Sequence, residues 1–169
     1  MTQDIAVRPE DISIRPAGEH EVGVILQFIR DLAEYEHLEH EAVATEETLR
    51  ETLFGPRPYA EVVLACLKGE PVGFALFFHN YSTFLGRPGI YLEDLYVRPA
   101  ARGFGVGRKL LKWLAATAVR RRCGRLEWSV LDWNEPSIQF YRKLGAVAMD
   151  QWKIFRVTGP TLDRLASEG

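Results

Sequence analysis

The stretch YLEDLYVRPAARGFGVGRKLLKWL, residues 91–114, decides the fold of this chain. Residues 90–97, IYLEDLYV, indicate a strand that ends at Arg98-Pro99. Residues 105–121 carry apolar side chains at helical spacing, which indicates a helix. A glycine-rich turn, RGFGVGR at residues 102–108, joins the two. Glycines allow a tight bend and a close approach of the backbone to a ligand.

The same turn is suited to phosphate. The first N–H groups of a helix and the helix dipole together bind anions. Arg102, Arg108 and Lys109 add positive charge at this point. The turn therefore predicts a cofactor that carries a pyrophosphate.

Three other interpretations of the turn are a Walker loop, a dinucleotide-binding fingerprint and a turn that binds no ligand. A Walker loop requires Gly, four residues and then Gly-Lys-Ser/Thr, and the turn has no such pattern. The dinucleotide fingerprint G-x-G-x-x-G fits Gly103 and Gly105 but meets Arg108, although Glu127 lies about twenty residues on, as that fingerprint expects. A turn without a ligand is the third reading, and the turn by itself leaves it open.

On both sides of this strand, turn and helix, the pattern of apolar residues predicts further strands and helices. Strands are predicted at residues 12–14, 60–67, 72–78, 90–97, 125–131, 146–149 and 152–157. Helices are predicted at residues 19–39, 45–54, 105–121 and 134–144, with Thr45 and Asn134 as caps. This order predicts a mixed α+β domain with a sheet of about seven strands.

Length, composition and charge exclude some classes of protein. The 169 residues suit one domain, which we expect to span residues 11–169 after a flexible tail at residues 1–10. Apolar residues make up 47%, and 21 basic against 23 acidic residues leave a charge of −2, which disfavours a general nucleic-acid binder. No run of 18 apolar residues and no signal peptide are visible, so we expect no membrane span. Two cysteines favour a reduced, cytoplasmic protein.

Two motifs carry a resemblance to a known family. Arg102-x-x-Gly105-x-Gly107 resembles the pyrophosphate loop of the GNAT acetyltransferase superfamily, and WNEPSIQFY at residues 133–141, followed by Leu144-Gly145-Ala146, resembles its second cofactor segment. Together with YLEDLYV at residues 91–97, they are similar to the spermidine/spermine (diamine) acetyltransferase group, which includes enzymes acting on thialysine. The resemblance implies a central, mostly antiparallel sheet with helices on both faces.

The resemblance also implies a reaction and a cofactor site. Acetyl-CoA would donate its acetyl group directly to an amine, without a covalent enzyme intermediate and without a metal, and Tyr141 would be the general acid. The backbone of the strand would pair with the pantetheine arm, the turn amides would hold the pyrophosphate, and the Asn134 segment would line the other side. The implied cofactor-binding residues are Leu95, Tyr96, Val97, Arg102, Gly103, Phe104, Gly105, Val106, Gly107, Arg108, Asn134, Pro136, Ser137 and Tyr141.

The amine must lose a proton, because an alkylammonium has a pKa near 10.4. Glu93 matches the family's proposed base. Glu93 and Asp94 are neighbours on one strand, so they point to opposite faces unless a bulge redirects one of them. Asp94 is kept as a charge contact. The implied substrate-binding residues are Tyr35, Glu36, Glu93, Asp94, Glu127 and Trp128.

The implied acceptor is a small diamine, a polyamine or a thialysine-like amino acid. Acetylation of a protein or peptide, and a CoA-binding sensor without catalysis, are the alternatives. His37-x-x-His40 specifies no third ligand, so we predict no metal. The family commonly forms dimers, so a homodimer is expected. The aromatic residues Phe74, Phe77, Phe78, Tyr81 and Phe84 are then either core or dimer contacts.

Overall fold

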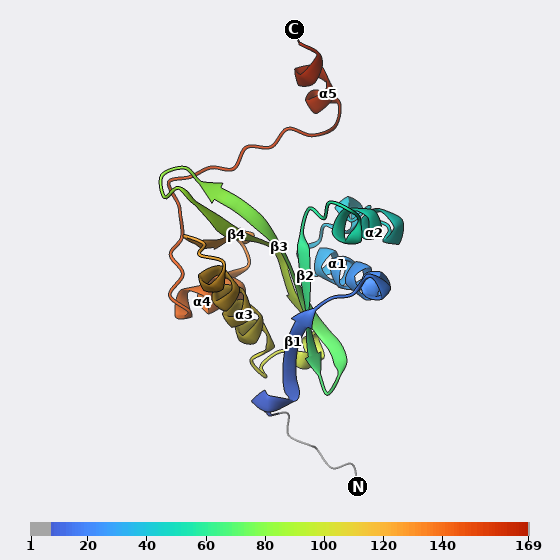
Figure 1. The fold of residues 1–169 in the computed structure, drawn as a ribbon, viewed down its shortest axis with the longest axis vertical. Coiled ribbons are helices and arrows are strands. Elements are labelled where there is room, and N and C mark those ends of the chain that lie inside the picture. Colours follow the sequence, from blue (N-terminus) through green and yellow to red (C-terminus); the bar gives the residue numbers. More distant parts are fainter. Residues whose placement is uncertain (1–7, 169) are drawn as a thin grey trace. The chain divides into compact units, whose positions relative to one another are not determined.

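The computed structural model describes residues 8–168 and divides into two compact units, residues 1–129 and 130–169 (Figure 1). Each unit is described by itself. Of the predicted flexible tail, residues 1–7 lie outside the described residues, and a 3-10 helix, Pro9–Asp11, opens the described part. The first unit contains β1 (Ile12–Pro16), α1 (Val22–Glu36), α2 (Glu46–Phe54), β2 (Glu61–Leu67), β3 (Glu70–Ser82), β4 (Arg87–Val97), α3 (Val106–Arg120) and β5 (Leu126–Trp128).

The sheet of the first unit has the order β1-β2-β3-β4-β5. Its first four strands are antiparallel, and β5 pairs in parallel with β4. The sheet is therefore mostly antiparallel, as the family resemblance implied. Lys68 and Gly69, with φ of 51° and 90°, form the tight turn between β2 and β3. Two successive left-handed residues match the twist of a hairpin.

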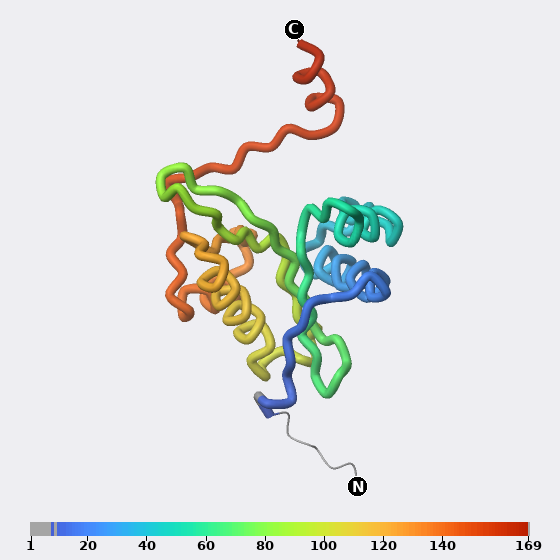
Figure 2. The backbone as a smooth tube through the Cα atoms, in the orientation of Figure 1, coloured from blue at the N-terminus to red at the C-terminus, as the bar shows by residue number. Residues whose placement is uncertain are grey.

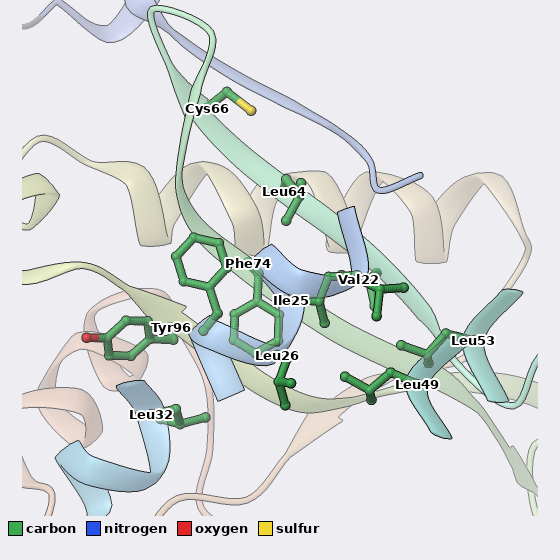
Figure 3. Packing of buried hydrophobic residues seen from close by; sticks show 12 residues of the cluster. Val22, Ile25, Leu26, Leu32, Leu49, Leu53, Leu64, Cys66, Phe74 and Tyr96 are labelled. Carbon is green, nitrogen blue, oxygen red and sulfur yellow. The ribbon is translucent and has the colours of Figure 1, made fainter. Parts of the chain in front are cut away.

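Helices α1 and α2 cover one face of this sheet (Figure 1). The apolar side of α1 places Val22, Ile25, Leu26, Phe28 and Leu32 in the core, and Figure 3 shows several of these beside Phe74 of β3 and Tyr96 of β4. The rings of Phe28 and Phe74 stack with centroids 5.5 Å apart. Helix α2 begins at the predicted cap, because Thr45 Oγ1 accepts a hydrogen bond from the Thr48 amide at 3.2 Å.

Helix α3 covers the opposite face (Figure 1). Its buried side carries Leu110 and Leu114, and the ring of Trp113 meets Phe77 of β3 edge-on, with centroids 6.0 Å apart. Helices thus lie on both faces of the sheet. The fold class, α+β, is confirmed.

The second unit contains α4 (Glu135–Lys143) and α5 (Gly159–Ser167). The strands predicted at residues 146–149 and 152–157 are wrong, because this segment is an extended run that pairs with no strand (Figure 2). The described part of the chain therefore has five strands rather than seven. The alternating apolar side chains that suggested the strands are exposed, with Trp152, Ile154 and Phe155 at 72%, 76% and 90%. A strand pattern forms a strand only where another strand pairs with it.

Candidate functional site

The glycine turn has the backbone that its sequence predicts. Gly103 and Gly105 have φ of +83° and +85°, and Gly105 is the N-cap of α3. A Cβ built at either position would meet nothing within 4 Å, so the space beside the turn is open. No side chain caps the helix, so the N–H groups of its first turn keep their capacity to bind an anion. Of the neighbouring side chains, Val106 is buried and Phe104 is 45% exposed.

The three cations beside the turn have different surroundings. Arg102 lies with its guanidinium over the rings of Tyr35 and Tyr96, at 5.0 and 5.5 Å from their centroids. Its Nε donates to the carbonyl oxygen of Val97 at 2.9 Å. Lys109 donates from Nζ to the carbonyl oxygen of Ile12 at 2.8 Å, and Arg108 is exposed on the first turn of α3. Arg108 therefore extends into solvent, whereas Arg102 and Lys109 are bonded to backbone carbonyl oxygens.

The edge of β4 beside the turn is open. Strand β5 pairs with β4 only from Ile90 to Leu92 and ends at Trp128. Beyond that point, Leu95, Tyr96 and Val97 pair with β3 on one side, and no strand of the described chain pairs with their other side. Backbone groups that a neighbouring strand leaves unpaired can bind an extended ligand as an added strand. The three residues predicted to meet the pantetheine arm lie at this edge.

A bulge separates the two neighbouring carboxylates. Asp94 pairs with Leu76 and Leu92 pairs with Phe77, so Glu93 is the extra residue of the bulge. Glu93 is exposed, whereas Asp94 is half-buried. Neighbouring residues of a strand can serve one site only where a bulge redirects one of them, and that bulge lies at Glu93.

Asp94 has the most perturbed carboxyl group of this region. Burial, with further contributions from the charges of Glu93 and Glu36, raises the pKa of Asp94 to about 6. Glu36 is the last residue of α1, and burial also raises its pKa. The charges of Glu36, at the end of α1, and of Glu93, at the bulge of β4, therefore both act on Asp94, and the three carboxylates form one group. Such a group attracts an ammonium ion.

The end of α1 is fixed by its neighbours. His37 takes the left-handed conformation, with φ of 60°, and ends the helix directly after Glu36. Tyr35, one residue earlier, places its ring under the Arg102 guanidinium. Tyr35 and Glu36, both predicted to bind substrate, thus lie with the carboxylates of β4 and with Arg102.

Glu127 and Trp128 lie on β5, opposite Tyr91 and Leu92. The Glu127 carboxylate accepts a hydrogen bond from Asn80 Nδ2 at 2.8 Å and forms an ion pair with Arg125 Nε at 2.7 Å. These partners hold the Glu127 carboxylate within the sheet. Asn80 and Arg125 belong to no motif, so this cluster could not be predicted from the sequence.

Three of the predicted residues of the second unit, Asn134, Ser137 and Tyr141, share one side of α4. Asn134 is its buried N-cap and accepts a hydrogen bond from the Ser137 amide at 3.3 Å, with Pro136 in the first turn. Tyr141 lies two turns from Asn134, half-buried, with its ring 5.4 Å from that of Phe140. Gly145, with φ of +90°, follows the helix as predicted. Positions 134, 137 and 141 are spaced for one side of a helix.

Among residues 8–168, no group of three or more His, Cys, Asp or Glu side chains is arranged to hold a metal ion. In the same residues, no helix is long and apolar enough to cross a membrane.

Comparison with known proteins gives the family. Residues 26–146 match the acetyltransferase (GNAT) family. A thialysine N-epsilon-acetyltransferase from Bos taurus is 40% identical over 168 residues, covering 93% of this chain and 98% of that protein. An L-ornithine N5-acetyltransferase from Arabidopsis thaliana is 32% identical over 197 residues, covering 90% and 86%. Among solved structures, the V. cholerae integron cassette protein VCH_CASS6 has a TM-score of 0.77 at 26% identity, covering 94% and 99%. The chain belongs to the GNAT family and is an N-acetyltransferase.

Proposed function

We propose that this protein acetylates the side-chain amine of a small diamino acid of the thialysine type, with diamines and polyamines as the wider acceptor class. The observation that carries the proposal is the group of three carboxylates, Glu36, Glu93 and Asp94, at the open edge of β4. A small acceptor with an ammonium group is complementary to that charge. The relatives named for thialysine and L-ornithine act on amino acids that carry a second amine, which supports the same class.

The residues of the first unit suit acetyl-CoA, which GNAT acetyltransferases use. The open space at Gly103 and Gly105 lets a diphosphate approach the amides of the first turn of α3. The open edge of β4 offers backbone groups of residues 95–97 to the pantetheine arm. When bound, acetyl-CoA supplies an acetyl group activated as a thioester. We propose that Asn134, Pro136 and Ser137 also contact this cosubstrate.

We propose Asp94, rather than Glu93, as the group that accepts the proton of the amine. A general base works best when its pKa lies near the operating pH, and burial brings the Asp94 pKa to about 6. Glu93 is exposed at the bulge, where its charge attracts the acceptor's ammonium group and raises the pKa of Asp94. Tyr141 is proposed to donate a proton to the departing thiolate, because a phenol with a pKa near 10 can protonate that group.

A panel of acceptors tests the substrate class. The protein is incubated with acetyl-CoA and thialysine, lysine, ornithine, putrescine, spermidine or a peptide with a free N-terminus, and thiol release is followed. We expect the highest kcat/KM with thialysine or ornithine. Turnover of the peptide alone would instead assign the protein to peptide acetylation. Binding of coenzyme A without turnover of any acceptor would leave only the sensor alternative.

Gly105→Ala tests the role of the turn. Both Gly105 and Gly69 are left-handed, and an added Cβ would meet nothing within 4 Å at either position. Each alanine is therefore expected to destabilise the fold by about 1 to 2 kcal/mol. Only the Cβ at residue 105 would stand between the turn and a diphosphate, so Gly105→Ala should weaken coenzyme A binding by at least about tenfold. Calorimetry measures this, with Gly69→Ala as the matched control. Equal affinity of the two variants would exclude the turn as the diphosphate site.

We further propose a cytoplasmic homodimer. Both cysteines, Cys66 and Cys123, are free thiols, which suits a reducing compartment. Of the aromatic residues named above, Phe74 and Phe77 are core, whereas Tyr81 and Phe84 are 61% and 95% exposed and are available to a second copy. Size-exclusion chromatography with light scattering measures the mass of the protein in solution. A monomer at micromolar concentration would contradict the proposed dimer.

A further inference from the structure

Two arginines of the connection between β4 and α3 reach the same side of α1. The Arg98 guanidinium lies over the Phe28 ring at 4.8 Å, and its Nε is 3.9 Å from the Asp31 carboxylate. Arg102 lies over the ring of Tyr35. Phe28, Asp31 and Tyr35 occur at positions i, i+3 and i+7, so they share one face of α1. The last two turns of α1 are therefore held against the connection that leads into the glycine turn.

The contact of Arg102 joins two parts of the proposed site. Arg102 directly precedes Gly103, and Tyr35 directly precedes Glu36. The guanidinium also lies over Tyr96, and its Nε donates to the Val97 oxygen, so it is fixed to the end of β4 as well. Glu36 in turn acts on Asp94. Contacts thus run from the glycine turn through Arg102 to Tyr35, which directly precedes the Glu36 whose charge acts on Asp94.

The arrangement requires a guanidinium. A planar, delocalised cation can lie flat on two aromatic rings and still donate from Nε in its own plane. A lysine ammonium is a single point with no such plane. The contact with Tyr35 attaches the guanidinium to the last turn of α1, and the contact with Tyr96 attaches the same group to β4.

We propose that Arg102 is a positioning residue for the amine acceptor: through Tyr35 it holds the end of α1, and with it Glu36, beside Asp94. The family resemblance implied a cofactor contact for this arginine. Here its guanidinium is engaged by two rings and a carbonyl oxygen, and the turn offers backbone amides for the diphosphate. The inference rests on the proposed amine acetyltransferase function, because it concerns the affinity for the acceptor.

A double-mutant cycle tests the proposal, using Arg102→Lys, Tyr35→Leu and the variant with both changes. Each single change should raise the KM for the acceptor about 3- to 30-fold, with a smaller effect on kcat. The double variant should be no worse than the more affected single one, because both changes remove the same contact. Tyr35→Phe keeps the ring and should recover most of the loss seen with Tyr35→Leu. Coenzyme A affinity should stay within about twofold in Arg102→Lys, whose charge is retained.

Two results would overturn the proposal. One is a multiplication of the two single effects on KM, which would show that Arg102 and Tyr35 act independently. The other is an Arg102→Lys variant that loses coenzyme A affinity while its acceptor KM is normal, which would make the arginine a cofactor ligand. The cycle is run on whichever acceptor the wild-type protein turns over. If that acceptor is a peptide, the proposed substrate class fails, but the coupling between Arg102 and Tyr35 is still measured.

Discussion

Replacing Asp94 by asparagine is expected to lower kcat by about 10²- to 10⁴-fold, the range that general base catalysis contributes. Asparagine keeps the size of the side chain and its hydrogen-bonding groups but accepts no proton at neutral pH. The acceptor would then have to lose its proton to water. Steady-state kinetics with saturating acetyl-CoA measure the effect. The wild-type kcat/KM should also fall as the pH drops below about 6, where Asp94 becomes protonated, and this acidic limb should be missing in the variant.

The same substitution is expected to stabilise the fold. Because folding raises the pKa of Asp94 from 3.8 to about 6, the folded chain binds the proton more tightly than the unfolded chain. Stability therefore falls as the pH rises between these two values, and at pH 7 the buried charge opposes folding. Asparagine removes that charge and should raise the free energy of unfolding by on the order of 1 to 3 kcal/mol at pH 7. Urea unfolding at pH 7 measures the gain.

Glu93→Gln is the matched control for Asp94→Asn. Glu93 is exposed, so its neutralisation should act mainly on the KM for a cationic acceptor and lower kcat by less than about tenfold. If Glu93→Gln abolishes turnover while Asp94→Asn does not, the base is Glu93, as the family resemblance implied.

Tyr141→Phe is the second change with a large expected effect. It removes one hydroxyl, keeps the ring beside Phe140 and should lower kcat by about 10²- to 10⁴-fold. The acceptor KM and the coenzyme A affinity should change little, because the phenol is proposed to act only when the thiolate departs. Tyr91→Phe is the matched control, since it removes a hydroxyl that hydrogen-bonds with Ser129 Oγ, directly after β5. Similar turnover in both variants would remove Tyr141 from the mechanism.

Local signals in the sequence predicted the parts of the fold that local interactions decide. The left-handed Gly105 at the start of α3, the Thr45 and Asn134 caps and the glycine after α4 all occur where their residue types require them. The order of strands and helices up to β5 followed from apolar periodicity. In these places a few neighbouring residues determine the backbone.

Features that depend on distant partners were not predicted correctly or at all. The alternation at residues 146–157 resembles that of a strand, but none of the strands in residues 8–168 pairs with it. Helix α5 has no buried side chain, and no helix was predicted at its position. The proposed roles of Asp94 and Glu93 depend on where the pairing with β3 shifts, and that shift is set by the partner strand. The Glu127 cluster likewise depends on Asn80, 47 residues away in sequence.

The short length of β5 determines which mutations can test the open edge of β4. Because β5 has only three residues, it leaves one edge of residues 95–97 open. A ligand at that edge would be bound by main-chain groups, and every amino acid except proline has the same main-chain N–H and C=O. Exchanging these side chains for others of similar bulk would therefore leave that recognition intact. Alanine at these positions removes no main-chain group, whereas proline at a residue whose N–H faces the open edge removes one.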